Sequence, residues 1–313
     1  MNVRVVGIDL GGTAMKAGVV GADGAAERLE SRPTGRDAGA EAVLERLGEL
    51  AGELAAGAAA IGVAVPGLVD EAGGVARASV NLGWRDVPLR ARLEERLGLP
   101  VAVAHDVRAA AHAEGAAGAA RGRSEWLLVT LGTGAGAAVV LGGAPYGGAH
   151  GFGGELGHLV VAPDGPPCGC GARGCVEALA SAAAVERRYA ERTGRAGPGE
   201  EVVAGRGDAA AGPAVAAEEV VARAVAGEAA AGAVWGEAVD ALAAGLAAAV
   251  VVLDPELIVV GGGLAEAGGA LFDPLRAALQ RRLPFLAAPP VVKAALGPDA
   301  GWRGAALLAR ELL

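Results

Sequence analysis

Short apolar runs that end at glycine or at a carboxylate alternate along the chain with longer segments of helical periodicity. The first run covers residues 3–8 and stops at Asp9 and two glycines, and a second run follows at 17–20. This pattern predicts two strands joined by a glycine turn. Apolar residues then recur at helical spacing over 43–54, which predicts an amphipathic helix with Asp37 available to cap its start.

Two further apolar runs predict buried strands. One covers residues 61–65, and the other, at 101–104, delivers His105 and Asp106 to its end. Because strands alternate with helices, the pattern favours an α/β sheet. Ligands of such sheets bind just past the strand ends, where Asp106 and the earlier Asp9 both lie.

The opening pattern returns near the middle of the chain and suggests an internal duplication. An apolar run at 126–131, a glycine turn at 132–136 and a return strand at 137–141 repeat the order seen at the start. Alanine-rich helix is predicted over most of 178–252, interrupted by a polar, glycine-rich segment at 194–213 that is expected to be a flexible surface loop. The remaining predicted elements are a strand at 257–260 and a helix at 302–313.

Composition narrows the classes of protein. The chain has 313 residues, of which 53% are hydrophobic and 20% charged, so two globular domains are expected rather than disorder. A net charge of -9 argues against a nucleic-acid surface. The longest apolar stretch, 240–254, is about two thirds of a bilayer span, so it predicts a buried helix end and no membrane partner. With no leader pattern before the first strand, the expected location is the cytoplasm.

Three glycine turns, each directly after a predicted strand, favour phosphate binding. Glycine lets backbone N–H groups approach a phosphate closely, and Thr13 and Thr133 add hydroxyls to two of the turns. The alternative is that each turn is only a tight hairpin. Neither a Walker sequence nor a dinucleotide-binding fingerprint in its usual context occurs. The candidate glycines are Gly11, Gly12, Gly132, Gly134, Gly261, Gly262 and Gly263.

Two strand-end carboxylates carry the candidate chemistry. Asp9 is of the type that binds hydrated Mg²⁺. Asp106 is the candidate general base, since a hydroxyl that attacks a γ-phosphate must lose its proton. The alternative is that Asp106 only caps the helix that begins there, although one carboxylate can do both.

A cysteine cluster predicts a metal site. The chain's three cysteines, Cys168, Cys170 and Cys175, cannot pair completely, and they lie within eight residues among glycines. Three thiolates with His158 as the fourth ligand would make a closed tetrahedral zinc site, which implies a structural ion. The alternative is three reduced free thiols.

At these motifs the chain resembles the ROK family of sugar kinases, and within it the bacterial glucokinases. The resemblance covers essentially the whole chain from residue 3. It implies the actin-like, ribonuclease H-like fold of two α/β domains with ATP and sugar between them. We expect a smaller domain over 1–106, completed by helix 300–313, and a larger one over 107–299 with the zinc loop at 158–177. The motifs are DLGGT at 9–13, LGTGAG at 131–136, ELGH at 155–158 and CGCGARGCVE at 168–177.

The resemblance also implies roles for single residues. Asp106 would take the proton from the sugar 6-hydroxyl, and the three glycine turns with both threonines would hold the nucleotide. His158 would hold zinc through one ring nitrogen and sugar through the other. Two residues depart from the family: His105 replaces the usual Asn, which bears on sugar preference, and Ala14 replaces a Lys or polar residue. The implied sugar ligands are Gly67, Asn81, His105, Glu155, His158 and Glu177.

The implied function is an ATP-dependent hexose kinase that makes glucose 6-phosphate with Mg²⁺. Fructose, mannose, N-acetylglucosamine or N-acetylmannosamine are alternative substrates, and polyphosphate or ADP are alternative donors. A sugar-sensing ROK regulator is the alternative from another class, but the phosphate motif begins at Asp9 and leaves no room for a preceding DNA-binding domain. The resemblance suggests a homodimer or a dimer of dimers.

Overall fold

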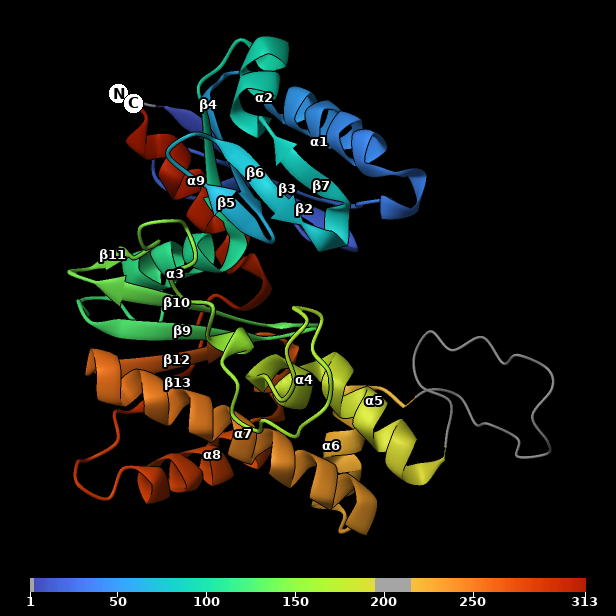
Figure 1. Ribbon diagram of the computed structural model, residues 1–313. Helices are drawn as coiled ribbons and strands as arrows, with labels where there is room; N and C mark the ends of the chain where they lie inside the picture. The colour runs from blue at the N-terminus through green and yellow to red at the C-terminus, as the bar shows by residue number, and fades with distance from the viewer. Residues whose placement is uncertain (1–2, 195–214) are drawn as a thin grey trace, which may run out of the picture. The chain divides into compact units, whose positions relative to one another are not determined.

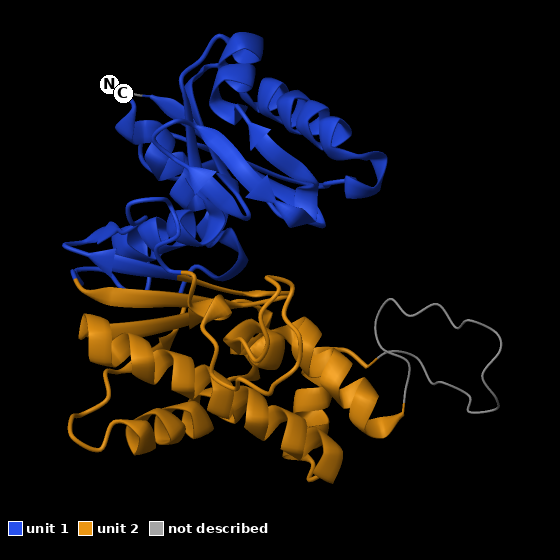
Figure 2. Cartoon of the chain, viewed as in Figure 1, with its two compact units in different colours: residues 1–124, 138–154, 295–313 blue, residues 125–137, 155–294 orange. Residues whose placement is uncertain are grey.

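The computed structural model describes residues 3–194 and 215–313, and all structural statements below refer to these (Figure 1). The chain divides into two compact units (Figure 2). Unit 1 comprises residues 1–124, 138–154 and 295–313, and unit 2 comprises 125–137 and 155–294. This division differs from the expected boundary at 106, because the helix that begins there packs on the C-terminal helix of unit 1. The loop expected at 194–213 lies outside the described residues, apart from its first residue.

A five-stranded sheet forms the centre of unit 1. Its order is β3-β2-β1-β4-β8, with β1, β4 and β8 parallel and β2 and β3 antiparallel. The parallel strands are apolar at nearly every position because helices cover both faces of the sheet. The strands are β1 (Arg4–Leu10), β2 (Ala14–Val20), β3 (Ala26–Pro33), β4 (Ala58–Val65) and β8 (Val101–His105).

Alternate residues of β1 supply two separate cores, since successive side chains of a strand point to opposite faces. Val6 and Ile8 join the larger core with α1 (Ala40–Leu54) and α2 (Leu89–Leu97). Val5 packs instead with Trp302 of α9 (Ala300–Glu311). The helix α3 (Asp106–Ala117) packs against α9.

Glycines let α9 lie directly on the sheet. A Cβ at Gly62 of β4 would lie 1.8 Å from the carbonyl oxygen of Ala305, and one at Gly7 of β1 would lie 2.0 Å from that of Trp302. Gly304 makes a similar approach to α3, where an added Cβ would lie 1.7 Å from the oxygen of Ala109. These contacts leave no room for a side chain, so the C-terminal helix is part of the core of unit 1.

Smaller elements complete unit 1. The strands β5 (Leu68–Asp70), β6 (Val75–Ser79) and β7 (Trp84–Val87) form an antiparallel sheet. The buried carboxylate of Glu114 in α3 accepts N–H groups from Ala119, Ala295 and Leu296, and so fixes the segment that leads into α9. The other elements are the 3-10 helices Arg36–Ala38, Val80–Leu82 and Gly297–Asp299, and β10 (Ala135–Leu141) with β11 (Ala144–Pro145), where β10 crosses the unit boundary.

Unit 2 places helices around a parallel β-core. Its strand β12 (Leu257–Gly261) pairs with β9 (Trp126–Leu131) on one side and β13 (Val291–Lys293) on the other. The helix α7 (Ala229–Leu253) is by length and composition apolar enough to cross a membrane, yet it packs against four other helices, as a core helix does. Those helices are α4 (Val176–Ala180), α5 (Ala182–Thr193), α6 (Ala217–Val225) and α8 (Gly269–Arg282), and the 3-10 helices of the unit are Leu156–His158 and Gly263–Ala267.

Most predicted elements occur at the predicted places, with two local differences. The expected cap is wrong: Asp37 lies in an exposed 3-10 turn, and α1 begins after Gly39 without a side-chain cap. Within the described residues, the predicted helical stretch 178–252 is also divided by a bend at Ser181 and by the short turn at 226–228.

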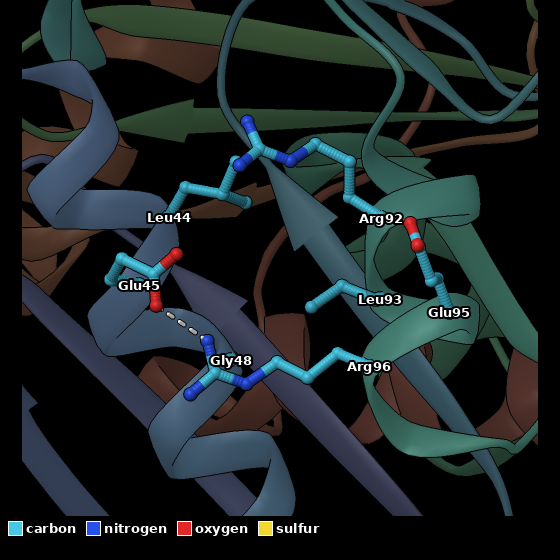
Figure 3. Close-up of a pocket in the computed structure, with 7 residues that line it drawn as sticks. All are labelled: Leu44, Glu45, Gly48, Arg92, Leu93, Glu95 and Arg96. Atoms are coloured by element: carbon cyan, nitrogen blue, oxygen red, sulfur yellow. Dashed lines mark hydrogen bonds and ion pairs between the residues drawn. The ribbon is translucent and has the colours of Figure 1, made fainter.

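An open groove of about 320 Å³ lies between α1 and α2 (Figure 3). Charged pairs border it, among them Arg96 with Glu45 at 2.7 Å. The lining residues are Leu44, Glu45, Gly48, Arg92, Leu93, Glu95 and Arg96. None of them is a candidate site residue.

The glycine contact under α9 predicts a large effect of one methyl group. We expect Gly62→Ala to lower the free energy of unfolding by more than about 2 kcal/mol, because its Cβ would meet a backbone carbonyl that cannot move alone. The matched control is Gly52→Ala on α1, where the Cβ would make an ordinary 3.6 Å contact with Leu97. It should stabilise the helix by about 0.5 to 1 kcal/mol. Equal unfolding midpoints in denaturant for both variants would contradict this packing.

Candidate functional site

The carboxylate of Asp106 sits where β8 gives way to α3 in unit 1. Its Oδ1 accepts the N–H of Val107 at 2.7 Å and lies 3.3 Å from Nε2 of His105. Burial raises the pKa of Asp106 to about 6, although the Val107 amide and the Arg108 charge lower it. The residue therefore has the properties of a base that works near neutral pH, and the same carboxylate also satisfies an amide at the helix start.

The carboxylate of Asp9 lies in the same unit, on β1. Its pKa is raised to about 7, mainly by burial and in smaller part by the charge of nearby Asp106, while Lys16 acts in the opposite sense. The backbone of α9 lies against it, since a Cβ at Gly301 would be 2.4 Å from Oδ2 of Asp9. Asp9 and Asp106 are thus two carboxylates that oppose each other's ionisation.

The turn after β1 is held in shape by Thr34, which directly follows β3. Thr34 donates its hydroxyl to the carbonyl of Gly11 at 2.6 Å and its N–H to that of Thr13 at 2.9 Å. The side chain of Thr13 remains exposed. Asn81 lies beside the turn, because a Cβ at Gly12 would be 3.5 Å from its Cβ.

Gly67 has a structural reason of its own to be glycine. Its φ is +99°, and an added Cβ would lie 2.2 Å from the carbonyl oxygen of Ala78. The geometry therefore requires glycine here whether or not the residue also contacts a sugar.

The two glycine turns of unit 2 lie side by side. They follow β9 and β12, which are adjacent parallel strands, and Gly262 has a φ of +84° with no room for a Cβ against the carbonyl of Leu131. Both turns therefore open at the same edge of the sheet, and the hydroxyl of Thr133 is exposed there. An edge of this kind, lined by the backbone of two glycine turns, can bind phosphate oxygens.

Glu177 connects the first of these turns to the cysteine loop. Its Oε2 accepts the N–H of Ala135 at 3.0 Å and approaches so closely that a Cβ at Gly134 would lie 2.6 Å away. It stands on α4, two residues after Cys175. Glu155 lies at the start of the 3-10 helix that carries His158, and its Oε2 is 4.0 Å from Nε2 of that ring.

The predicted metal ligands come together in unit 2. The ligand atoms of the four residues all lie within 4.8 Å of one another. Nδ1 of His158 is 3.6 Å from Sγ of Cys168, and the sulfurs of Cys170 and Cys175 are 3.7 Å apart. Zinc bound tetrahedrally at about 2.3 Å separates its sulfur ligands by about 3.8 Å, so this donor set fits the ion.

The thiols also show what the metal would change. Burial, together with the neighbouring thiols Cys168 and Cys170, raises the pKa of Cys175 to about 12, so without a metal this thiol is protonated at neutral pH. A zinc ion requires the thiolate and would displace the proton.

Sequence reasoning missed one carboxylate near Asp106. Glu71, directly after β5, accepts the backbone N–H of His105 at 2.9 Å and the side chain of Arg108 at 2.8 Å. No motif or spacing marks it, because its partners are more than thirty residues away in the chain. The candidate residues thus form two groups: Asp9, Gly11, Gly12, Thr13, Gly67, Asn81, His105 and Asp106 lie in unit 1, and the other glycines, Thr133, Glu155, His158, Glu177 and the cysteines lie in unit 2.

Comparisons with known proteins agree over the whole length of the chain. Residues 5–312 match the ROK family. A glucokinase from Thermotoga maritima is 37% identical, and the match covers 99% of this chain and 98% of the relative. A solved ROK hexokinase from Thermus thermophilus is 38% identical with a TM-score of 0.82 over 99% of both chains. A ROK family glucokinase from Streptomyces griseus, solved in complex with glucose and AMPPNP, is 33% identical with a TM-score of 0.82 over 98% of this chain and 99% of that chain.

These matches confirm both the resemblance read from the motifs and the predicted actin-like α/β fold class. They extend from the first strand to the last helix, so they do not rest on one shared motif. The chain belongs to the ROK family.

Proposed function

We propose that this protein is an ATP-dependent glucokinase, which transfers the γ-phosphoryl group of ATP to the 6-hydroxyl of glucose. The observation that carries the proposal is the 37% sequence identity with a glucokinase over 99% of this chain. The raised pKa of the strand-end carboxylate Asp106, about 6, supports it. A coupled assay over a panel of hexoses and phosphoryl donors tests it, with glucose and ATP expected to give the highest kcat/KM.

Asp106 acts as the general base. With its pKa at about 6, the carboxylate is ionised at neutral pH and still basic enough to accept a proton. The hydroxyl loses its proton late in phosphoryl transfer, so positioning of the base matters more than its strength. The bond from Oδ1 to the amide of Val107 leaves Oδ2 for the substrate.

Nucleotide and Mg²⁺ binding would use the glycine turns with Asp9. Thr13, Thr133 and the backbone N–H groups of the turns are donors for phosphate oxygens. Asp9 fits a Mg²⁺ site because it and Asp106 raise each other's free energy when both are ionised, and a divalent cation relieves that repulsion. When bound, Mg²⁺ supplies charge that neutralises the transferred phosphoryl group.

Sugar binding would use Glu155, His158 and Glu177 near the anomeric end, with Gly67 and Asn81 on the other side. His158 supports this role, because Nδ1 faces the cysteines and Nε2 faces Glu155. A structural zinc on Nδ1 would fix the ring and so aim Nε2 at a sugar hydroxyl.

His105 replaces the family's usual Asn beside the base. Its side chain is 9% exposed and its Nε2 lies against Asp106. His105 can therefore contribute both to sugar preference and to the position of the Asp106 carboxylate. Other hexoses therefore remain in the assay panel as alternative substrates. The proposal also includes a cytoplasmic location, a homodimer or a dimer of dimers, and no nucleic-acid or membrane partner.

Replacement of the base tests the mechanism. Asp106→Asn keeps the size of the side chain and one acceptor oxygen but cannot take a proton, so we expect kcat below about one hundredth of the parent value. Glucose affinity measured by calorimetry should stay within a few-fold. Faster turnover would contradict the assignment of Asp106 as the base.

The raised pKa of Asp106 predicts an acid limit to activity. The carboxylate works in its ionised form, so kcat/KM for glucose should fall about tenfold per unit as the pH decreases below about 6. Steady-state rates at saturating ATP and Mg²⁺ measure this, with zinc content checked at each pH as the control. A profile that is flat down to about pH 5 would contradict the prediction.

The zinc proposal predicts linked losses of stability and sugar binding. Cys170→Ser should lower the melting temperature by at least about 5 °C and weaken glucose binding, because energy of binding at a structural site is energy of folding. Elemental analysis of the parent should give about one zinc per chain. Chelated protein should recover on addition of zinc. Full stability and activity without metal would show that the cluster has no such role.

A further inference from the structure

Glu71 makes two hydrogen bonds that end within two residues of Asp106. One oxygen, Oε1, accepts both the backbone N–H of His105 at 2.9 Å and Nε of Arg108 at 2.8 Å. The first donor lies at the last residue of β8 and the second in the first turn of α3. The carboxylate thus bridges the junction at which Asp106 stands, from both sides of that residue.

The guanidinium of Arg108 is buried and extends the bridge to a loop. Its side chain is 3% exposed, and its Nη1 donates to the carbonyl of Gly151 at 3.2 Å. Gly151 in turn lies against β5, since its φ is +80° and an added Cβ would be 2.9 Å from the oxygen of Val69. The loop that precedes Glu155 is therefore tied to the same group.

These contacts line a cavity of about 480 Å³ within unit 1. Asp70 and Arg77 form a second ion pair in this cavity, at 2.8 Å, but neither hydrogen bond of Glu71 involves them. Asp70 bonds instead to Arg77 and to the N–H of Gly73. The cavity thus holds two similar pairs, of which one reaches the β8 to α3 junction and the other stays on the β5 to β6 hairpin.

We propose that Glu71 is a positioning residue for the base: by holding the N–H of His105 and the side chain of Arg108 on one oxygen, it fixes the direction of the Asp106 carboxylate. The inference rests on the proposed function, in which Asp106 takes the proton of the sugar hydroxyl. Hydrogen bonds to a charged group are about twice as strong as neutral ones, so they can fix a junction between two elements. Orientation within a fraction of an ångström is what a base in phosphoryl transfer requires.

A role limited to stability would give a different pattern of effects. If Glu71 only compensated the buried charge of Arg108, its loss would lower the folded fraction and affect binding and turnover together. A positioning role lowers kcat in the folded enzyme and leaves the affinity for glucose nearly unchanged, because the base contributes to the transition state more than to ground-state binding.

The experiment compares Glu71→Ala, Glu71→Gln and Asp70→Asn in the full chain. We expect Glu71→Ala to lower kcat by about ten- to a hundredfold, with glucose Kd within about threefold of the parent. Glu71→Gln keeps an oxygen that can accept both hydrogen bonds, so it should recover most of that loss. Asp70→Asn is the matched control, since it weakens the neighbouring ion pair in the same cavity and should leave kcat unchanged.

Removal of Glu71 alone leaves Arg108 buried without its carboxylate, which can impair folding. The double variant Glu71→Met with Arg108→Met removes both charges at similar volume and still leaves the His105 amide without its acceptor. It should be folded, with kcat lowered as in Glu71→Ala. Hydrogen exchange gives a readout that needs no substrate: the amide of His105 should exchange faster in Glu71→Ala and in the double variant, and not in Asp70→Asn.

The outcomes separate this proposal from the proposed function. Parent-like kcat and exchange in Glu71→Ala, or equal kcat losses in Asp70→Asn, would overturn the positioning role. Loss of kcat strictly in step with glucose affinity and melting temperature would assign Glu71 to stability and overturn it as well. A parent enzyme that phosphorylates no hexose would instead refute the proposed function, while the exchange of His105 would still show whether Glu71 holds the junction.

Discussion

The packing of α9 against the sheet of unit 1 is the contact on which the geometry around Asp9 depends. The helix lies on Gly7 and Gly62 at distances that no side chain would allow, and its first turn lies against the carboxylate of Asp9 at Gly301. This close approach covers part of the carboxylate, and burial is the main cause of its raised pKa. A helix from the far end of the chain thus helps to raise the pKa of a carboxylate on the first strand.

Unit 1 and unit 2 place their candidate residues by different physical means. The cysteine loop brings its ligands together over a short stretch of sequence, where glycines allow the backbone to fold around a small volume. The carboxylates of unit 1 are placed instead by strands, because parallel neighbours end at the same edge of a sheet. A bound metal would stabilise the fold of the cysteine loop directly. The positions of the carboxylates in unit 1 depend instead on the packing of the whole unit.

Two carboxylates in unit 1 fix loops and strand ends by accepting backbone N–H groups. Glu114 receives three backbone N–H groups, and Glu71 receives one backbone N–H group and a buried guanidinium. Glu114 is buried, so its carboxylate needs these donors, and it fixes the segments that supply them. The side chain of Glu71 is partly exposed, but it pairs with the buried guanidinium of Arg108 and fixes its segment in the same way. The exposed ion pairs between α1 and α2, such as Glu45 with Arg96, are screened by water and contribute little to the free energy of unfolding.

The strands, the glycine turns, the strand-end position of Asp106 and the cysteine cluster can all be read from the sequence alone. These features follow from periodicity, from the conformational freedom of glycine and from ligands close together in the chain, all of which are local. Other features emerge only in the folded chain: Asp37 lies in an exposed turn and does not cap α1, α3 packs against α9, and Glu71 contacts His105 and Arg108. The raised pKa values of Asp9 and Asp106 belong with these, because burial and contacts between distant segments are set by packing, which no local pattern encodes.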